Sequence, residues 1–182
     1  MPANERERVS RKETMVRYYI ATKLENHAAH NELRDWLADR GHQITYDWTT
    51  HGPVWRDGNE RIAEVAGFEA RGVVTADLVV VLLPGGRGTH AELGIAIGAG
   101  VPVLLVPSER GQIEGEGVCA FYRHPMVTIA AHQDLARLAL EIATIAPAKP
   151  VWLSDAEYAR QLGVPVETYR DRRRRAGEAR RE

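Results

Sequence analysis

The sequence is poor in cysteine and has no long apolar run. Cys119 is the single cysteine among 182 residues, so no disulfide can form within the chain and a reducing compartment is expected. The residues around Cys119 contain no activating pattern, and we expect an inert thiol rather than a nucleophile. No apolar stretch is long enough to span a bilayer, and the polar first residues do not resemble a signal peptide. These absences favour a cytoplasmic protein.

An excess of charge of one sign is also missing. The formal net charge is −1 and 44% of the residues are hydrophobic, which is typical of a globular protein with a real core. The balance hides basic residues that gather towards the two ends, in "RERVSRK" and "RDRRRRAGEARRE". At this length the chain has room for one ordinary domain and a small appendage.

Apolar and amphipathic segments alternate along residues 16–146. The apolar segments predict strands at 16–22, 43–49, 77–84, 101–107 and 126–130. The amphipathic segments predict helices, with side chains spaced to face inward at Leu33, Trp36, Leu37, Ile62, Val65 and Phe68. The segment 77–84 has apolar residues on both faces, as in parallel strands that helices cover on each side. The alternation predicts an α/β fold with a doubly wound open parallel sheet of about five strands, of flavodoxin or Rossmann type.

The two ends of the chain are expected to differ from this domain. Residues 1–15 are polar and charged, which predicts a flexible N-terminal segment. Beyond the linker-like "APAKP", residues 151–182 are expected to form a small helical unit that resembles a helix–turn–helix with a basic tail. The residues of that unit placed to contact nucleic acid are Thr168, Arg170, Arg172 and Arg173. A pair of assembly helices with a solvated tail fits the same pattern, because two short helices cannot bury a core alone.

A glycine-rich loop follows the strand predicted at 77–84. The sequence "PGGRGTH" supplies Gly85, Gly86 and Gly88 where a strand passes into a helix. Glycines let the backbone approach a ligand closely, and a helix N-terminus presents free N–H groups and a positive dipole end. Ala91 stands where G-x-G-x-x-G needs its last glycine, and no G-K-[ST] follows, so the loop matches neither the dinucleotide fingerprint nor the P-loop. An anionic or strongly polar ligand is expected here.

Glu92 is the single acid in "GGRGTHAELGIAIGAG", and two interpretations of it compete. Thr89 and Glu92 have the spacing of a capping box, in which Thr89 caps the helix and Glu92 bonds back to the Thr89 amide. Taken alone, the spacing favours this structural role over a chemical one. His90 is expected to be a surface or supporting residue rather than a catalyst.

The wider pattern adds a family resemblance over residues 16 to 145. The stretches "YYIAT" and "ADLVVVLLP", and the motif G-T-x-x-E-L-G-x-A followed by a G-x-P strand entry, resemble the nucleoside 2-deoxyribosyltransferase family. That family includes nucleoside 5′-monophosphate N-glycosidases. The motif residues are Gly88, Thr89, Glu92, Leu93, Gly94, Ala96, Gly100 and Pro102.

The resemblance implies a site and a mechanism. Glu92 would attack the anomeric carbon of the sugar as the base departs, Tyr19 would orient Glu92, and Asp77 would lie in the pocket to assist base protonation or sugar contacts. A carboxylate suits this place because it stabilises an oxocarbenium-like state and can trap it covalently. A departing base also needs an acid with a raised pKa. The resemblance implies no metal or organic cofactor, and it implies a homo-oligomer, a dimer or larger.

Further residues are candidates for contact with the substrate because they follow predicted strands or lie in the glycine-rich loop. Arg87 and Lys23 would hold a 5′-phosphate. Trp48 would stack on the base, beside Asp47 and His51. The other candidates in these loops are Thr22, Gly86, Gly88 and Thr89.

Two functions are carried forward as hypotheses. The leading one is an enzyme that cleaves the N-glycosidic bond of a (deoxy)nucleoside or its 5′-monophosphate through a glycosyl-Glu92 intermediate, and passes the sugar to another base or to water. The family's transferases use an asparagine near the C-terminus, and this chain has none after Asn59, so the resemblance supports cleavage more than transfer. The alternative is a nucleotide-sensing DNA-binding regulator, whose degenerate pocket controls the helix–turn–helix.

Overall fold

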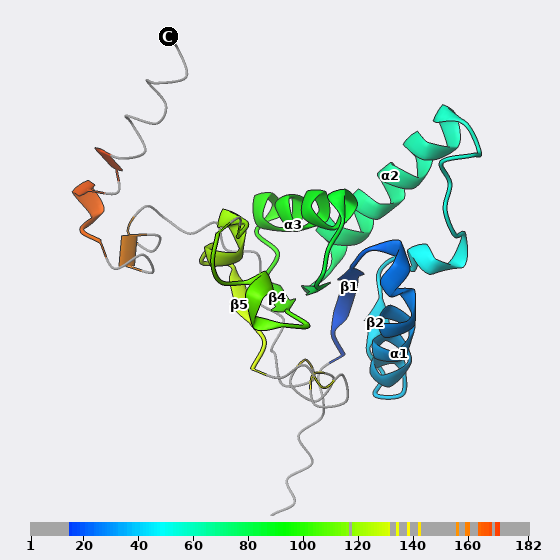
Figure 1. Cartoon of the computed structure of the whole chain (residues 1–182), viewed down its shortest axis with the longest axis horizontal. Helices are drawn as coiled ribbons and strands as arrows, with labels where there is room; N and C mark the ends of the chain where they lie inside the picture. Colours follow the sequence, from blue (N-terminus) through cyan, green and yellow to red (C-terminus); the bar gives the residue numbers. More distant parts are fainter. Residues whose placement is uncertain are drawn as a thin grey trace, which may run out of the picture.

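The centre of the structure, a computed structural model, is one five-stranded parallel sheet (Figure 1). The described residues are 15–116 and 118–131 and, closer to the C-terminus, 134, 138, 142, 156, 159, 160, 164–168, 170 and 171. The strands are β1 (Arg17–Ala21), β2 (Gln43–Ile44), β3 (Leu78–Leu82), β4 (Val103–Val106) and β5 (Val127–Ile129). Their order in the sheet is β2-β1-β3-β4-β5, and every neighbouring pair is parallel. The predicted α/β fold is confirmed.

Helices cover both faces of this sheet. The long described helices are α1 (His27–Ala38), α2 (Asn59–Thr75) and α3 (Arg87–Ala99). On one face the side chains of Tyr19 and Ala21 pack with residues of α2 and α3, and on the other those of Tyr18 and Ile20 pack with residues of α1. Alternate residues of β1 therefore enter two separate cores, as the two-sided apolar pattern predicts.

The strand order places a crevice at the carboxyl ends of β1 and β3. The chain leaves β1 towards α1 on one face and leaves β3 towards α3 on the other, which is the arrangement that opens a ligand site in such sheets. Thr22, directly after β1, donates from Oγ1 to the carbonyl oxygen of Leu82 at the end of β3 (2.9 Å). Asn26 Nδ2 donates to the same Thr22 oxygen (3.0 Å). These hydrogen bonds hold the carboxyl ends of β1 and β3 together at the crevice.

The second strand is shorter than the predicted 43–49. Beyond it the Asp47 carboxylate accepts a hydrogen bond from the Thr49 N–H (3.0 Å) at the start of a short 3₁₀ turn, Trp48–Thr50. A local side chain–backbone bond of this kind competes with extended structure. The residues after Ile44 thus form a loop at the edge of the sheet.

Three side chains predicted to face inward are instead exposed. The exposed fraction is 37% for Trp36, 39% for Ile62 and 42% for Phe68. Figure 1 shows the N-terminal turns of α2 projecting beyond the sheet, so part of the apolar face of this helix has no strand beneath it. Helical spacing predicts which residues share a face, and it does not predict how far the sheet extends under them.

Little of the predicted C-terminal unit falls among the described residues. Leu138 and Ile142, which follow β5, are helical and buried in the core on the α1 face. Thr168 is helical and half-buried, Arg170 is helical and exposed, and their contact with nucleic acid stays a prediction. Residues 1–14 and the predicted contacts Arg172 and Arg173 lie outside the described residues. Among the helices that are described, none is both long and apolar enough to cross a membrane.

Candidate active site

The start of α3 decides between the two interpretations of Glu92. The helix begins after Gly86, and Thr89 Oγ1 accepts a hydrogen bond from the Gly86 N–H (3.0 Å). Thr89 therefore serves as the third helical residue that bonds back to the cap, and it is not the cap itself. Glu92 lies one turn further on, where it takes no part in capping. The capping-box interpretation of Thr89 and Glu92 is wrong because the helix starts earlier than the spacing suggested.

Glu92 instead meets Tyr19 across the core. Its carboxylate oxygen Oε1 accepts a hydrogen bond from the Tyr19 hydroxyl, and the two residues are 73 positions apart in the sequence. Only 7% of Glu92 is exposed and Tyr19 is fully buried. The structure thus brings together the two residues to which the family resemblance assigns the nucleophile and its partner.

The surroundings of Glu92 oppose its negative charge. Burial raises the pKa of Glu92 to about 7, with the nearby Glu69 also raising it and the Tyr19 hydrogen bond acting in the opposite direction. Burial and the neighbouring carboxylates raise the pKa of Tyr19 far above its ordinary value, so its hydroxyl remains a donor throughout the working range of pH. A carboxyl that titrates near neutrality beside a permanent donor is typical of an active site.

Glu92 lies in the wall of a cleft of about 200 Å³ at the carboxyl ends of the strands. The lining combines residues that follow β1 and β2 with residues of α2 and α3. Those residues are Thr22, Leu24, Trp48, His51, Gly52, Pro53, Val54, Val65, Glu69, Gly88, Thr89 and Glu92. The cleft is therefore lined by five of the predicted contacts: Thr22, Trp48, His51, Gly88 and Thr89.

Glu69 is a cleft residue that the sequence interpretation missed. It lies on α2, is half-buried, and has no hydrogen bond or ion pair within the described part of the chain. Burial raises the pKa of Glu69, while His51 lowers it. The available signal was its position four residues after the inward-facing Val65, which places both on one face of the helix.

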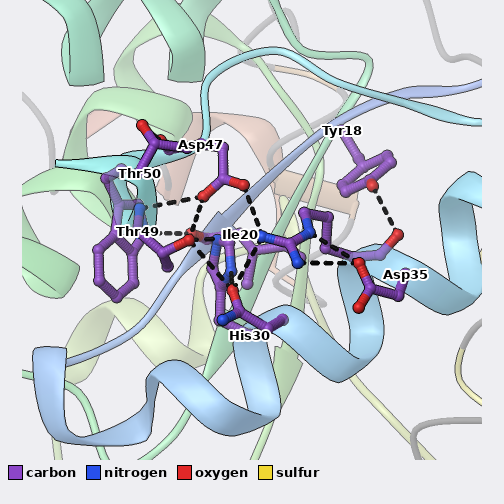
Figure 2. A network of polar contacts seen from close by, with 10 residues as sticks. Tyr18, Ile20, His30, Asp35, Asp47, Thr49 and Thr50 are labelled. Atoms are coloured by element: carbon purple, nitrogen blue, oxygen red, sulfur yellow. Dashed lines mark hydrogen bonds and ion pairs between the residues drawn. The ribbon is translucent and has the colours of Figure 1, made fainter. Parts of the chain in front are cut away.

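A polar network holds the loop that carries Trp48 (Figure 2). Arg34 of α1 donates from Nη1 to Asp47 Oδ2 (2.7 Å), and Asn31 Oδ1 accepts from the Thr49 hydroxyl (3.1 Å). Trp48 donates its indole N–H to the Ile20 carbonyl oxygen (3.0 Å). Although burial raises the pKa of Asp47, hydrogen bonds from Thr49 and Arg34 outweigh that effect and leave the pKa lowered. Asp47 therefore anchors the loop, and Trp48, only 6% exposed, forms a fixed wall of the cleft.

His90 supports the glycine-rich loop at the start of α3. Its Nδ1 lies 2.7 Å from the Gly86 carbonyl oxygen, so Nδ1 carries the proton, and Nε2 accepts from the Tyr122 hydroxyl (2.8 Å). The two rings are stacked with centroids 5.8 Å apart. The structure gives His90 the supporting role expected of it.

Lys23, Gly86 and Arg87 surround the N-terminus of α3 without lining the cleft. A Cβ added to Gly86 would lie 3.7 Å from Lys23 Cβ, so these two residues are neighbours. Arg87 is the first residue of α3 and is exposed. Their contact with a phosphate stays a prediction.

Asp77 is not brought to the cleft. It precedes β3, at the amino edge of the sheet, where its carboxylate pairs with Arg17 Nη2 (2.7 Å) and accepts from the Arg17 backbone N–H (2.9 Å). Hydrogen bonding to Arg17 lowers the pKa of Asp77. The structure therefore does not place Asp77 beside Glu92, because a residue before a parallel strand lies at the opposite edge of the sheet from the carboxyl ends.

Fold and site together define a class of protein, a doubly wound α/β protein with a buried tyrosine–glutamate pair at its ligand crevice. No protein-family model matches the chain, and no curated protein matches it. Among solved structures, the chain is similar to the CMP N-glycosidase BcmB of Clostridium botulinum, at 18% identity and a TM-score of 0.49 over 69% of this chain and 96% of that one. It is also similar to a conserved protein from Enterococcus faecalis V583, at 18% identity and a TM-score of 0.42 over 71% and 96% of the two chains. In the part of the chain described, no three His, Cys, Asp or Glu side chains group as a metal site.

Proposed function

We propose that the protein cleaves the N-glycosidic bond of a nucleoside or nucleoside 5′-monophosphate through a glycosyl ester on Glu92. The observation that carries this proposal is the Tyr19–Glu92 hydrogen bond, which leaves Glu92 at the cleft rather than at the helix cap. The sequence motif around Glu92 and its family resemblance point to the same chemistry.

In the first step, Glu92 acts as the nucleophile. Tyr19 occupies Oε1, and no hydrogen bond from a described residue occupies Oε2, which is therefore the oxygen that attacks the anomeric carbon. The C–N bond breaks as the new C–O bond forms, and its electron pair leaves with the base. A buried carboxylate stabilises the positive charge that develops on the sugar, because the cleft walls screen it less than water would.

Glu69 is the acid that the departing base requires. Burial raises the pKa of Glu69, and Glu69 lies in the same cleft as Glu92, so the form that reacts is the one with the proton of the coupled pair on Glu69 and the negative charge on Glu92. The base takes the Glu69 proton as the C–N bond breaks. In the second step water attacks the anomeric carbon, Glu69 takes a proton from that water, and Glu92 is released as a carboxylate.

The N-terminus of α3 supports a 5′-phosphate on the substrate. Free backbone N–H groups, Lys23 and Arg87 gather there, and all three attract anions. Water is the proposed acceptor of the sugar, because no asparagine follows Asn59 to complete the family's transferase site. The favoured reaction is therefore hydrolysis of a nucleoside monophosphate to the free base and the sugar phosphate.

A panel of ribo- and deoxyribonucleosides and their 5′-monophosphates tests this function. Chromatography would follow release of free base, with and without a second base as acceptor. We expect the wild type to release base from at least one nucleotide, and Glu92→Gln to bind that nucleotide without releasing base. Glu60→Gln, at the exposed start of α2, is the matched control and should keep full activity. Base release by Glu92→Gln at the wild-type rate would contradict the proposal.

The resemblance also implies a homo-oligomer, which we retain as a proposal. The exposed Ile62 and Phe68 on α2 and the exposed Trp55 are apolar surface of the kind that subunit interfaces cover. Sedimentation analysis of the purified chain would give its assembly state, and a monomer at all concentrations would contradict this expectation.

A further inference from the structure

A second cavity opens at the carboxyl ends of β3 and β4, on the α1 face of the sheet, and it shares no lining residue with the Glu92 cleft. Its volume is about 380 Å³, within the range of small-molecule sites, roughly 300–1,000 Å³. Its apolar walls come from α1, from the ends of both strands and from the residues that follow them: Ala29, Leu82, Leu83, Pro84, Val106 and Pro107. The Leu83 N–H donates to the Val106 carbonyl oxygen (2.9 Å), so the two strand ends form one continuous wall.

The polar side chains that line the second cavity, within the described part of the chain, are those of Asn26 and Ser108. Thr22 Oγ1 uses its hydrogen on the Leu82 carbonyl oxygen, so it can only accept from Asn26, which makes Asn26 Nδ2 the donor. The other amide hydrogen of Asn26 and its Oδ1 have no hydrogen bond to a described residue. Ser108 Oγ accepts from Gln112 Nε2 (2.8 Å) and keeps its own hydrogen for another acceptor. The cavity thus offers two donors and one acceptor.

These features favour an uncharged, flat ligand with a few polar groups on its edge. A charged ligand would lose its hydration without gaining a counter-ion, because none of the described lining residues carries a charge. This argues against a phosphate group, and the hydroxyl groups of a sugar would face proline and leucine side chains. A nucleobase meets the requirements, because its faces are apolar and its edge carries donors and acceptors of the kind that asparagine pairs with.

We propose that the second cavity binds a free nucleobase, with Asn26 and Ser108 at its polar edge and the apolar walls against its faces. The choice of a nucleobase among uncharged heterocycles rests on the proposed function, which releases a base in the neighbouring cleft. Thr22 lines that cleft, and Asn26 lines the second cavity. The hydrogen bond between them (3.0 Å) joins the two sites directly. The second cavity is therefore placed to hold a base beside the site of its release.

Nuclear magnetic resonance of the ¹⁵N-labelled full-length protein tests the proposal while free uracil, cytosine, adenine and hypoxanthine are added in turn. We expect at least one base to shift the amide signals of Ala29, Leu83 and Ser108 until they saturate. The signals of Gly88 and Thr89 report separately on the cleft. Benzene is the comparison probe, because it has the flat apolar faces of a base and no hydrogen-bonding edge. It should bind the second cavity more weakly than the best base, by roughly tenfold or more.

Three variants on and before α1 locate the site and identify what recognises the base. Ala29→Leu places extra methyl groups in the second cavity and should weaken binding of the base there by roughly tenfold or more. Ala28→Leu is the matched control, because Ala28 is the preceding, exposed residue and should leave binding unchanged. Asn26→Leu keeps the size of the side chain and removes its amide, so it should weaken binding of the base and leave that of benzene unchanged.

Several outcomes would overturn the proposal. These are shifts confined to Gly88 and Thr89, no shift with any base, and binding of benzene as tight as that of the best base. Binding to Ala29→Leu as tight as to the wild type, or equal loss in Ala29→Leu and Ala28→Leu, would overturn it as well. All these readouts measure binding and not base release. If the wild type releases base from no nucleotide, the proposed function fails while the test of the second cavity stands.

Discussion

The burial of Glu92 disfavours its ionised form and at the same time makes that form a stronger nucleophile. Its folded-state pKa of about 7 lies above the ordinary value of 4.5, mainly because it is buried. At neutral pH roughly half of the molecules therefore carry the ionised nucleophile. One effect can be measured in the pH dependence of the free energy of unfolding, and the other in the pH profile of kcat/KM.

The first prediction concerns the free energy of unfolding of Glu92→Gln. Because folding raises the pKa of Glu92, its contribution to stability is fully present below about pH 4.5 and is lost as the pH rises through about 7. Glutamine cannot ionise, so the variant should lose less stability over that window. We expect an advantage over wild type that approaches about 3 kcal/mol at pH 8 and vanishes near pH 4.5. Urea unfolding at several pH values measures it, and a difference that does not change with pH would contradict the assigned pKa.

The second prediction concerns the pH profile of Tyr19→Phe. The Tyr19 hydroxyl lowers the pKa of Glu92, so its removal should raise that pKa above about 7. The acid limb of kcat/KM then moves to higher pH, with a loss of roughly tenfold at pH 6 and a smaller loss at pH 8.5. Tyr18→Phe is the matched control, since the Tyr18 hydroxyl donates to the Arg34 carbonyl oxygen (3.2 Å) on the opposite face. An equal loss at every pH in Tyr19→Phe would show that the hydroxyl does not act on the ionisation of Glu92.

At the scale of elements, the close approach of α2 to β1 places the Tyr19 ring. A Cβ added to Gly72 would lie 2.7 Å from Tyr46 Cβ and 3.0 Å from two ring carbons of Tyr19. Gly72 therefore makes room for the ring whose hydroxyl reaches Glu92. The helix and the strand meet at a distance that only glycine permits.

The third prediction follows from this contact. Gly72→Ala should destabilise the fold by about 1–3 kcal/mol and lower kcat by displacing the Tyr19 ring from Glu92. Gly67→Ala on the same helix meets nothing within 4 Å, so it should stabilise the protein by about 0.5–1 kcal/mol and leave kcat unchanged. Thermal unfolding and kinetics on both variants provide the comparison. If the two alanines behaved alike, the packing of α2 on β1 would not control the site.

At the scale of the whole molecule, the sequence predicts the architecture better than the site. Continuous apolar runs define β1, β3 and β4 because buried parallel strands need no polar face. The length of β2 was overestimated because the apolar pattern of 43–49 does not reveal the 3₁₀ turn that begins after Asp47. The pairing of Glu92 with Tyr19 was predicted from the family resemblance alone, because residue spacing within one helix carries no information about a contact 73 positions away. Glu69 was not predicted as a site residue, because its face of α2 lines the cleft only through the way that helix packs over the sheet.

The fourth prediction asks which end of the sheet does the chemistry. Asp77 lies at the amino edge, bonded to Arg17, and Glu69 lies at the carboxyl edge beside Glu92. If Glu69 supplies the proton, Glu69→Gln should lower kcat by roughly 100-fold or more and remove the alkaline limb of the pH profile, because an amide gives up no proton. Asp77→Asn should leave kcat/KM unchanged and lower only the free energy of unfolding, because Asp77 is paired with Arg17 at the edge of the sheet opposite the cleft.

The two variants form a matched pair, because each replaces one carboxyl by the corresponding amide. Base-release kinetics and thermal unfolding on both separate the roles: Glu69→Gln should affect the rate, and Asp77→Asn the midpoint of unfolding. A folded Asp77→Asn protein that had lost base release, beside an active Glu69→Gln protein, would move the chemistry to the amino edge. Because parallel strands gather their helix N-termini and following loops at the carboxyl edge, we expect the rate to depend on that edge alone.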